Sequence, residues 1–143
     1  MNPDARRRLE DLLDREIELA HVLSAALADE KTVLTGTSPE AVEKNAAEKI
    51  RVLETIEKLE VERRALCASP LSSGIAATVV ERWRKLMELM AGCRTANEVN
   101  GHIIHVRQHQ IRQLMDIVRG GPSITYDPHG KTFAKALRAI ARA

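Results

Sequence analysis

Three histidines are spaced by three and four residues along the chain, so they share one face of a helix: His102, His105 and His109. Histidines at this spacing can bind zinc or nickel. The same strip also carries acidic and basic side chains, namely Glu98, Arg112 and Asp116. This mixture is typical of a solvated helix face, so we interpret the strip as a hydrated or partner-contacting face and predict no metal site.

Other arrangements that could support catalysis lack the spacing of known motifs. The two cysteines, Cys67 and Cys93, form neither a CxxC pair nor a zinc-ligand set, and they imply no disulfide framework. No glycine-rich phosphate-binding loop follows a strand-like segment. We therefore expect a protein that is not an enzyme and that binds no cofactor.

Two asparagines interrupt the apolar face of the longest helical pattern. Apolar residues recur there at steps of three and four, the period of a helix: Val79, Trp83, Leu86, Met87, Met90, Cys93, Ile104, Ile111, Leu114, Met115 and Val118. Asn97, Asn100 and Gly101 fall on the same face. Buried asparagines fix register between helices. We predict a polar register layer of Asn97, Asn100, Glu16 and Arg63; direct contact of the asparagines with a bound protein is the alternative.

The composition favours helices over sheets. Hydrophobic residues make up 44% of the 143 residues but aromatic residues only 2%, so the core must be mainly aliphatic. Charged residues make up 29% and the net charge is +2, which fits solvated helix faces better than a nucleic-acid footprint. The first residues lack the apolar run of a signal peptide, and no stretch approaches the roughly 18 apolar residues of a membrane span. We expect a cytoplasmic protein without stable membrane insertion.

Three helical segments can be delimited, over residues 3–34, 39–67 and 75–119. Asn2 and Ser38 supply caps for the first two, each followed by a proline in the first turn. Short connections favour antiparallel neighbours. The predicted fold class is therefore all-α: an antiparallel three-helix bundle or coiled coil with a long third helix, in a domain formed by residues 1–119.

The third segment is longer than its neighbours. At the rise of an α-helix it would span about 65 Å, against about 45 Å for each of the others. We expect it either to extend beyond them or to break near Gly92 or Gly101. If it extends, residues 102–119 present an apolar stripe without an intramolecular partner, which is typical of a binding site. The alternative is that the last segment of the chain folds back and covers this stripe.

Residues 120–143 differ in kind from the rest. They contain four basic residues and one acidic residue, Asp127, so their net charge is +3. Within 131–143, Phe133, Leu137 and Ile140 fall on one face of a short helical pattern. A helix this short is marginal by itself. We predict a basic, mobile tail that can form a short fourth amphipathic helix.

Several motifs together resemble one known family. They are Trp83-x-x-Leu86-Met87-x-Leu89, Cys93-Arg94-x-x-Asn97-x-x-Asn100-Gly101-x-Ile103-Ile104, Arg107-Gln108-His109-Gln110 and Thr125-Tyr126-Asp127-Pro128-x-Gly130. Over nearly its whole length the chain is similar to the FlgN family of flagellar export chaperones. The motif around Tyr126 reads Asp-Pro where Gly-Pro is expected, and aspartate is acceptable in a turn.

The resemblance implies a cytoplasmic chaperone of the flagellar type III export system. Such a protein binds the hook–filament junction (hook-associated) subunits before secretion, keeps their terminal helices soluble and delivers them to the export apparatus. In this chain the expected client-binding residues are Ile104, Ile111, Leu114, Met115, Val118, Phe133, Leu137 and Ile140. Tyr126 matches the family's tail tyrosine and is expected to dock to the export gate.

The sequence leaves two other interpretations open. The first is a generic coiled-coil adaptor or self-associating helical bundle, in which the third helix forms a homodimer when no client is bound. The second, nucleic-acid binding by the basic tail, is disfavoured because four positive charges are few.

Overall fold

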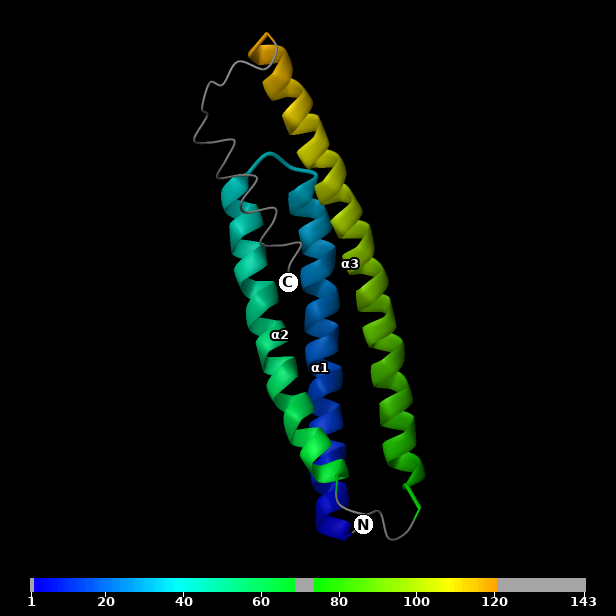
Figure 1. The fold of residues 1–143 in the computed structure, drawn as a ribbon. Helices are drawn as coiled ribbons and strands as arrows, with labels where there is room; N and C mark the ends of the chain where they lie inside the picture. The colour runs from blue at the N-terminus through cyan, green and yellow to red at the C-terminus, as the bar shows by residue number, and fades with distance from the viewer. Residues whose placement is uncertain (1, 69–73, 121–143) are drawn as a thin grey trace.

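The computed structural model describes residues 2–68 and 74–120, which form three α-helices and no strands. Helix α1 covers Pro3–Leu34, α2 covers Pro39–Cys67 and α3 covers Ala77–Val118. The predicted all-α fold is confirmed (Figure 1). The predictions for the tail, including its mobility and the short fourth helix, fall on residues 121–143 and lie outside the described part of the chain.

Local side chains explain where the helices begin and end. The Asn2 side chain accepts a hydrogen bond from the Asp4 backbone amide at 2.9 Å, and the Ser38 hydroxyl accepts one from the Ala41 amide at 3.2 Å. Both bonds satisfy amides that have no partner within the helix. Helix α3 ends before Gly120, whose φ of 63° is a conformation that favours glycine.

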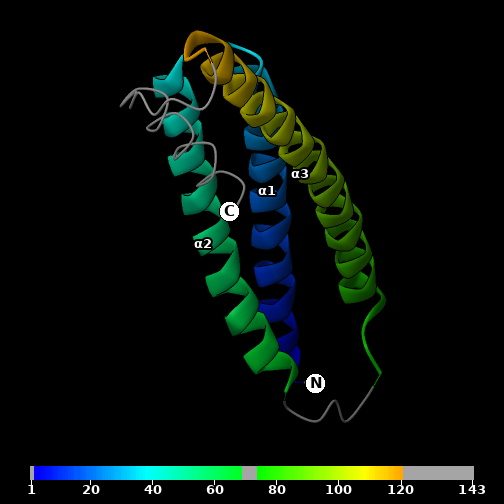
Figure 2. The same ribbon diagram turned by 45° about the horizontal axis from the view of Figure 1, so that its top comes forward.

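Helix α1 is the central element of the bundle. It packs against both α2 and α3, whereas the backbones of α2 and α3 do not come into contact along their described lengths. Both ribbon views show α1 between the other two helices (Figures 1 and 2). The chain runs along α1, back along α2 and forward again along α3, so α1 and α3 are parallel.

The core consists of three apolar clusters along α1, and α3 contributes to each of them. The lower cluster joins α1 to the start of α3 and contains Leu9, Leu13, Ile17, Ala20, Val79 and Leu86. Helix α2 contributes to the other two clusters, Val52 to the middle one and Val42 and Ala46 to the upper one. The middle cluster contains Leu23, Leu27, Val52 and Cys93, and the upper cluster contains Leu34, Val42, Ala46 and Ile104. Burial of these aliphatic side chains against α1 is the main apolar contribution to stability.

Helix α3 does not break at either glycine. It runs through Gly92 and Gly101 as one helix of 42 residues, and its upper end projects beyond the connection between α1 and α2 (Figure 1). The projecting part is shorter than expected, because Ile104 still packs against Leu34 and the Arg107 guanidinium donates to the Gly36 carbonyl at 2.8 Å. Among the described residues, the segment of α3 without helical neighbours therefore begins after Ile111 and not near residue 102, which corrects the expectation from helix length.

Candidate functional site

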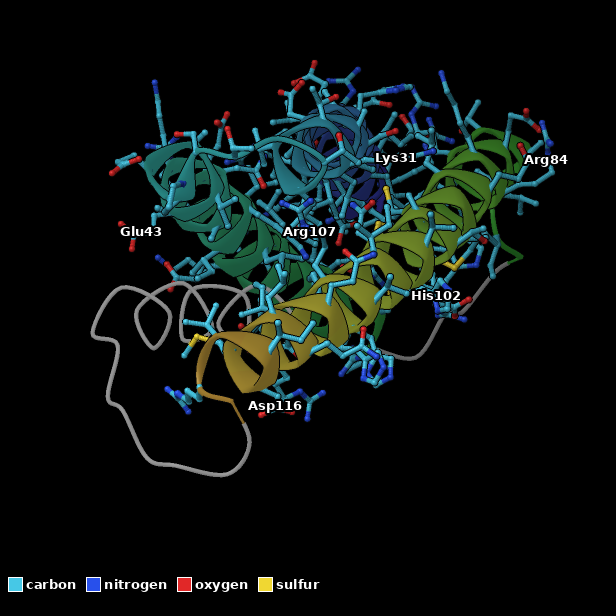
Figure 3. The ribbon with its side chains drawn as sticks, turned by 90° about the horizontal axis from the view of Figure 1, so that it is seen from above. Lys31, Glu43, Arg84, His102, Arg107 and Asp116 are labelled. Carbon is cyan, nitrogen blue, oxygen red and sulfur yellow. The ribbon has the colours of Figure 1, made fainter. Side chains whose placement is uncertain are left out.

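The three histidines of α3 face solvent. His102, His105 and His109 are all exposed, and Figure 3 shows His102 and Asp116 pointing away from the bundle. Within residues 2–68 and 74–120, no group of three histidine, cysteine or acidic side chains is close enough together to hold a metal ion. Of the two cysteines, Cys67 is exposed and Cys93 is buried, and burial raises the pKa of the Cys93 thiol. The three histidines therefore belong to a solvent-exposed, polar face of α3.

A buried polar cluster joins all three helices between the middle and upper apolar clusters. The Glu30 carboxylate of α1 is fully buried and accepts a hydrogen bond from the Lys49 ammonium of α2 at 3.2 Å. The Asn100 amide of α3 donates to Glu30 at 2.8 Å and to the Leu27 carbonyl at 2.9 Å. Lys49 also donates to the Asn97 side-chain oxygen at 2.8 Å. Each buried charged group thus has hydrogen-bond partners: Glu30 accepts from Lys49 and Asn100, and Lys49 donates to Glu30 and Asn97.

A second asparagine-to-backbone bond strengthens the contact between α1 and α2. The Asn45 amide donates to the Ala26 carbonyl of α1 at 3.0 Å, one helical turn below Glu30. The Asn45 side-chain oxygen is buried and has no hydrogen-bond partner among the described residues. The buried side chains around Glu30 are therefore linked by hydrogen bonds, whereas Asn45 uses only its side-chain donor.

A separate polar group lies lower in the bundle. The Arg63 guanidinium of α2 donates to the buried Glu16 carboxylate of α1 at 2.8 Å, and it stacks 4.6 Å from the ring centre of Trp83 on α3. Burial raises the pKa of the Glu16 carboxyl, although the hydrogen bond and charge of Arg63 oppose this effect. The cation–π contact adds a favourable interaction between α2 and α3.

The predicted register layer is thus divided between two places. Asn97 and Asn100 are in the cluster around Glu30, whereas Glu16 and Arg63 form the lower group. Glu16 and Glu30 are 14 residues apart on α1, which corresponds to roughly 21 Å at the helical rise. One layer cannot include both, and this corrects the prediction that all four residues share one.

Glu30 and Lys49, the two charged side chains of the cluster, are not among the residues predicted from the sequence. Their positions in the helical pattern nevertheless indicate burial. Glu30 lies between Leu27 and Leu34 on the buried face of α1. Lys49 likewise lies three residues after buried Ala46 and three before buried Val52. Two opposite charges at inward positions of neighbouring helices indicate a buried ion pair.

The projecting end of α3 presents apolar side chains to solvent. The exposed fractions are 61% for Leu114, 75% for Ile117 and 84% for Val118, while Ile111 and Met115 are partly buried. Ile117 was not among the expected client-binding residues. Ile104 was, but it is only 3% exposed, so the structure assigns it to the core and corrects that expectation. Phe133, Leu137, Ile140 and Tyr126 lie outside the described residues.

An all-helical fold with an exposed apolar helix end is typical of a scaffold that binds other proteins. The family model described as FlgN protein matches residues 1–133, and the chain belongs to this family of flagellar export chaperones. No curated protein and no solved structure matches the chain. Within the described residues, none of the helices is sufficiently long and apolar to traverse a lipid bilayer.

The buried ion pair can be tested by removing its cation. Lys49→Met leaves the Glu30 carboxylate buried without a counter-charge, so we expect a loss of about 3–5 kcal/mol in the free energy of unfolding. The double variant Glu30→Gln/Lys49→Met should recover most of this loss, because neither buried charge remains. Urea denaturation followed by circular dichroism measures both. As a control, Arg84→Met removes two solvent-exposed ion pairs, with Glu81 and Glu88, and should barely change stability.

The raised pKa of Glu16 predicts a pH dependence of stability. Because the folded protein binds this proton more readily than the unfolded chain, the contribution of Glu16 to folding increases as pH falls through its folded-state pKa, and is lost as pH rises. As the pH is lowered from 7 to 4.5, the ordinary pKa of a glutamate, the unfolding free energy of the wild type should therefore rise relative to that of Glu16→Gln. A difference that stays constant over this range would contradict the effect of burial.

Proposed function

We propose that this protein is a cytoplasmic export chaperone that binds the terminal helices of flagellar hook–filament junction subunits and delivers them to the type III export apparatus. Family membership supports the general role in export. The observation that supports helix binding is the projecting apolar end of α3, where Leu114, Ile117 and Val118 face solvent. An amphipathic client helix would bury its apolar face against this surface.

The folding of the client helix on binding and the small size of the α3 surface together determine the expected affinity. A client helix that folds on binding must lose conformational entropy, which reduces the net affinity for a given buried area. The α3 end is a short segment and not a deep cleft, so binding of moderate affinity and release without ATP are expected. Such release suits a protein that must transfer its client.

The client-binding surface then includes Ile111, Leu114, Met115 and Val118, with Ile117 as an addition and Ile104 removed. Phe133, Leu137 and Ile140 of the tail belong to the proposal on the strength of their apolar pattern.

A self-associating bundle would use the same exposed end of α3. Sedimentation with and without client distinguishes the two, since a dimer that persists unchanged when client is added supports self-association.

The α3 end can be tested with charged substitutions. In the double variant Leu114→Asp/Val118→Asp, both side chains are exposed, so we expect an unchanged circular dichroism spectrum and unfolding midpoint. Binding of a labelled peptide that spans the terminal helix of a junction subunit should weaken at least about tenfold, because two apolar contacts are replaced by charges. Fluorescence anisotropy measures the Kd. Val61→Asp, at a 64% exposed position of α2, is the matched control and should bind like the wild type.

The role of Tyr126 is tested separately from client binding. If its ring anchors the protein at the export gate, Tyr126→Ala should reduce secretion of junction subunits in flagellated cells while the peptide Kd stays the same. Tyr126→Phe keeps the ring and should retain most of the secretion. Equal secretion by wild type and Tyr126→Ala would rule out a docking role for this residue.

A further inference from the structure

The space between α2 and α3 forms a groove over α1. Because the backbones of α2 and α3 do not touch, two cavities open between them. The lower cavity has a volume of about 360 Å³, and Leu13, Val79, Val80 and Trp83 contribute to its mainly apolar wall. The middle cavity, of about 160 Å³, is lined in part by Leu53 and Met90. Both lie well below the projecting end of α3 and are separate from the surface discussed above.

Trp83 lies at the edge of the lower cavity and is partly exposed to solvent. It is the single tryptophan of the chain and is 41% exposed, with one face covered by the Arg63 guanidinium. Val80, one turn earlier, is 51% exposed. Tryptophan and arginine together at a half-open apolar cavity are the residue types that contribute most to protein–protein binding energy.

The charged side chains that line the two cavities are all basic. Arg6 and Arg63 line the lower cavity and Lys49 and Arg94 line the middle one, and neither lining includes an acidic residue. Glu16 and Glu30 neutralise Arg63 and Lys49 from beneath, and Arg6 lies 3.9 Å from the Glu10 carboxylate on α1. Arg94 is exposed and has no ion pair within the described part of the chain, whereas the exposed Arg82 and Arg84 of α3 are paired with acidic residues.

We propose that the groove between α2 and α3 is a second docking site, which binds an amphipathic helix of a partner protein whose apolar stripe is bordered by acidic residues. The apolar side chains enter the two cavities and cover Trp83. The acidic border faces Arg6 and Arg94. In this position the partner helix is the fourth helix of the bundle, and it contacts α2 and α3 where they do not contact each other.

Charge complementarity favours a partner over the chain's own C-terminal segment. That segment carries Lys131, Lys135, Arg138 and Arg142, so its charge has the same sign as the groove. Like charges brought together in a partly desolvated groove oppose binding. A second copy of the chain is a further occupant that the experiment must separate from an acidic partner helix.

Trp83 provides a direct readout of occupancy. The probe is a synthetic amphipathic peptide of about 18 residues, long enough to form a helix, without tryptophan and with glutamates beside a leucine stripe. A companion peptide has lysines in place of the glutamates. We expect the glutamate peptide to shift Trp83 emission to shorter wavelength and to bind about tenfold more tightly than the lysine peptide, with a preference that falls as salt is added. Equal binding of the two peptides, or no change in emission, would overturn the proposal.

Two pairs of variants locate the site. Arg94→Glu should weaken glutamate-peptide binding about fivefold and strengthen lysine-peptide binding, whereas Arg84→Glu, on the outer face of α3, should change neither (Figure 3). Val80→Asp should abolish the emission shift, and Val99→Asp, at a position of similar exposure outside both cavities, should leave it intact.

Two further outcomes separate this site from the other surfaces. The Leu114→Asp/Val118→Asp variant should bind the glutamate peptide normally, so failure of the proposed client site and failure of the groove site are distinguishable. If sedimentation shows a dimer that the glutamate peptide does not dissociate, and Val80→Asp converts it to monomer, the groove is an interface between copies and the acidic-helix proposal is wrong.

Discussion

A buried carboxylate between the middle and upper apolar clusters contacts side chains of both other helices. Glu30 is fully buried on α1, and a carboxylate in that environment is stable only with a cation and with hydrogen-bond donors around it. Lys49 of α2 supplies the cation and Asn100 of α3 supplies a donor. Because the backbones of α2 and α3 do not meet, this cluster fixes the register of each on α1 and, through Lys49 and Asn97, of one relative to the other.

The open side of the bundle follows from this use of long polar side chains. Lys49 and Arg63 extend from α2 toward α3 and reach Asn97 and Trp83 across a gap that the two helix backbones leave between them. Shorter apolar side chains in their place would require the helices to approach more closely before they made contact. Two polar bridges thus join α2 to α3, and a mainly apolar cavity opens beside each of them.

Capping residues and helical periodicity were enough to predict the fold class and most helix boundaries. Asn2, Ser38 and the prolines after them act locally, so their effect is visible in sequence. The length of α3 that projects beyond the connection between α1 and α2 could not be predicted in the same way. It depends on contacts between residues far apart in the sequence, namely those of Ile104 with Leu34 and of Arg107 with Gly36. For the same reason, the pattern predicts Asn97 and Asn100 as polar residues of a register layer but does not show that the carboxylate bonded to Asn100 is Glu30 and not Glu16.

The two polar groups also explain how the protein keeps apolar surface exposed without losing a defined structure. An exposed apolar groove favours self-association, and an unpaired helix face favours rearrangement. Here the Glu30 cluster penalises any shift of α2 or α3, since a shift would leave buried charges without partners. The Glu16–Arg63–Trp83 group does the same at the lower end, where Arg63 also covers part of the indole. Specificity of helix pairing therefore resides in polar contacts beneath the groove, which leaves the apolar side chains above them available for a partner helix.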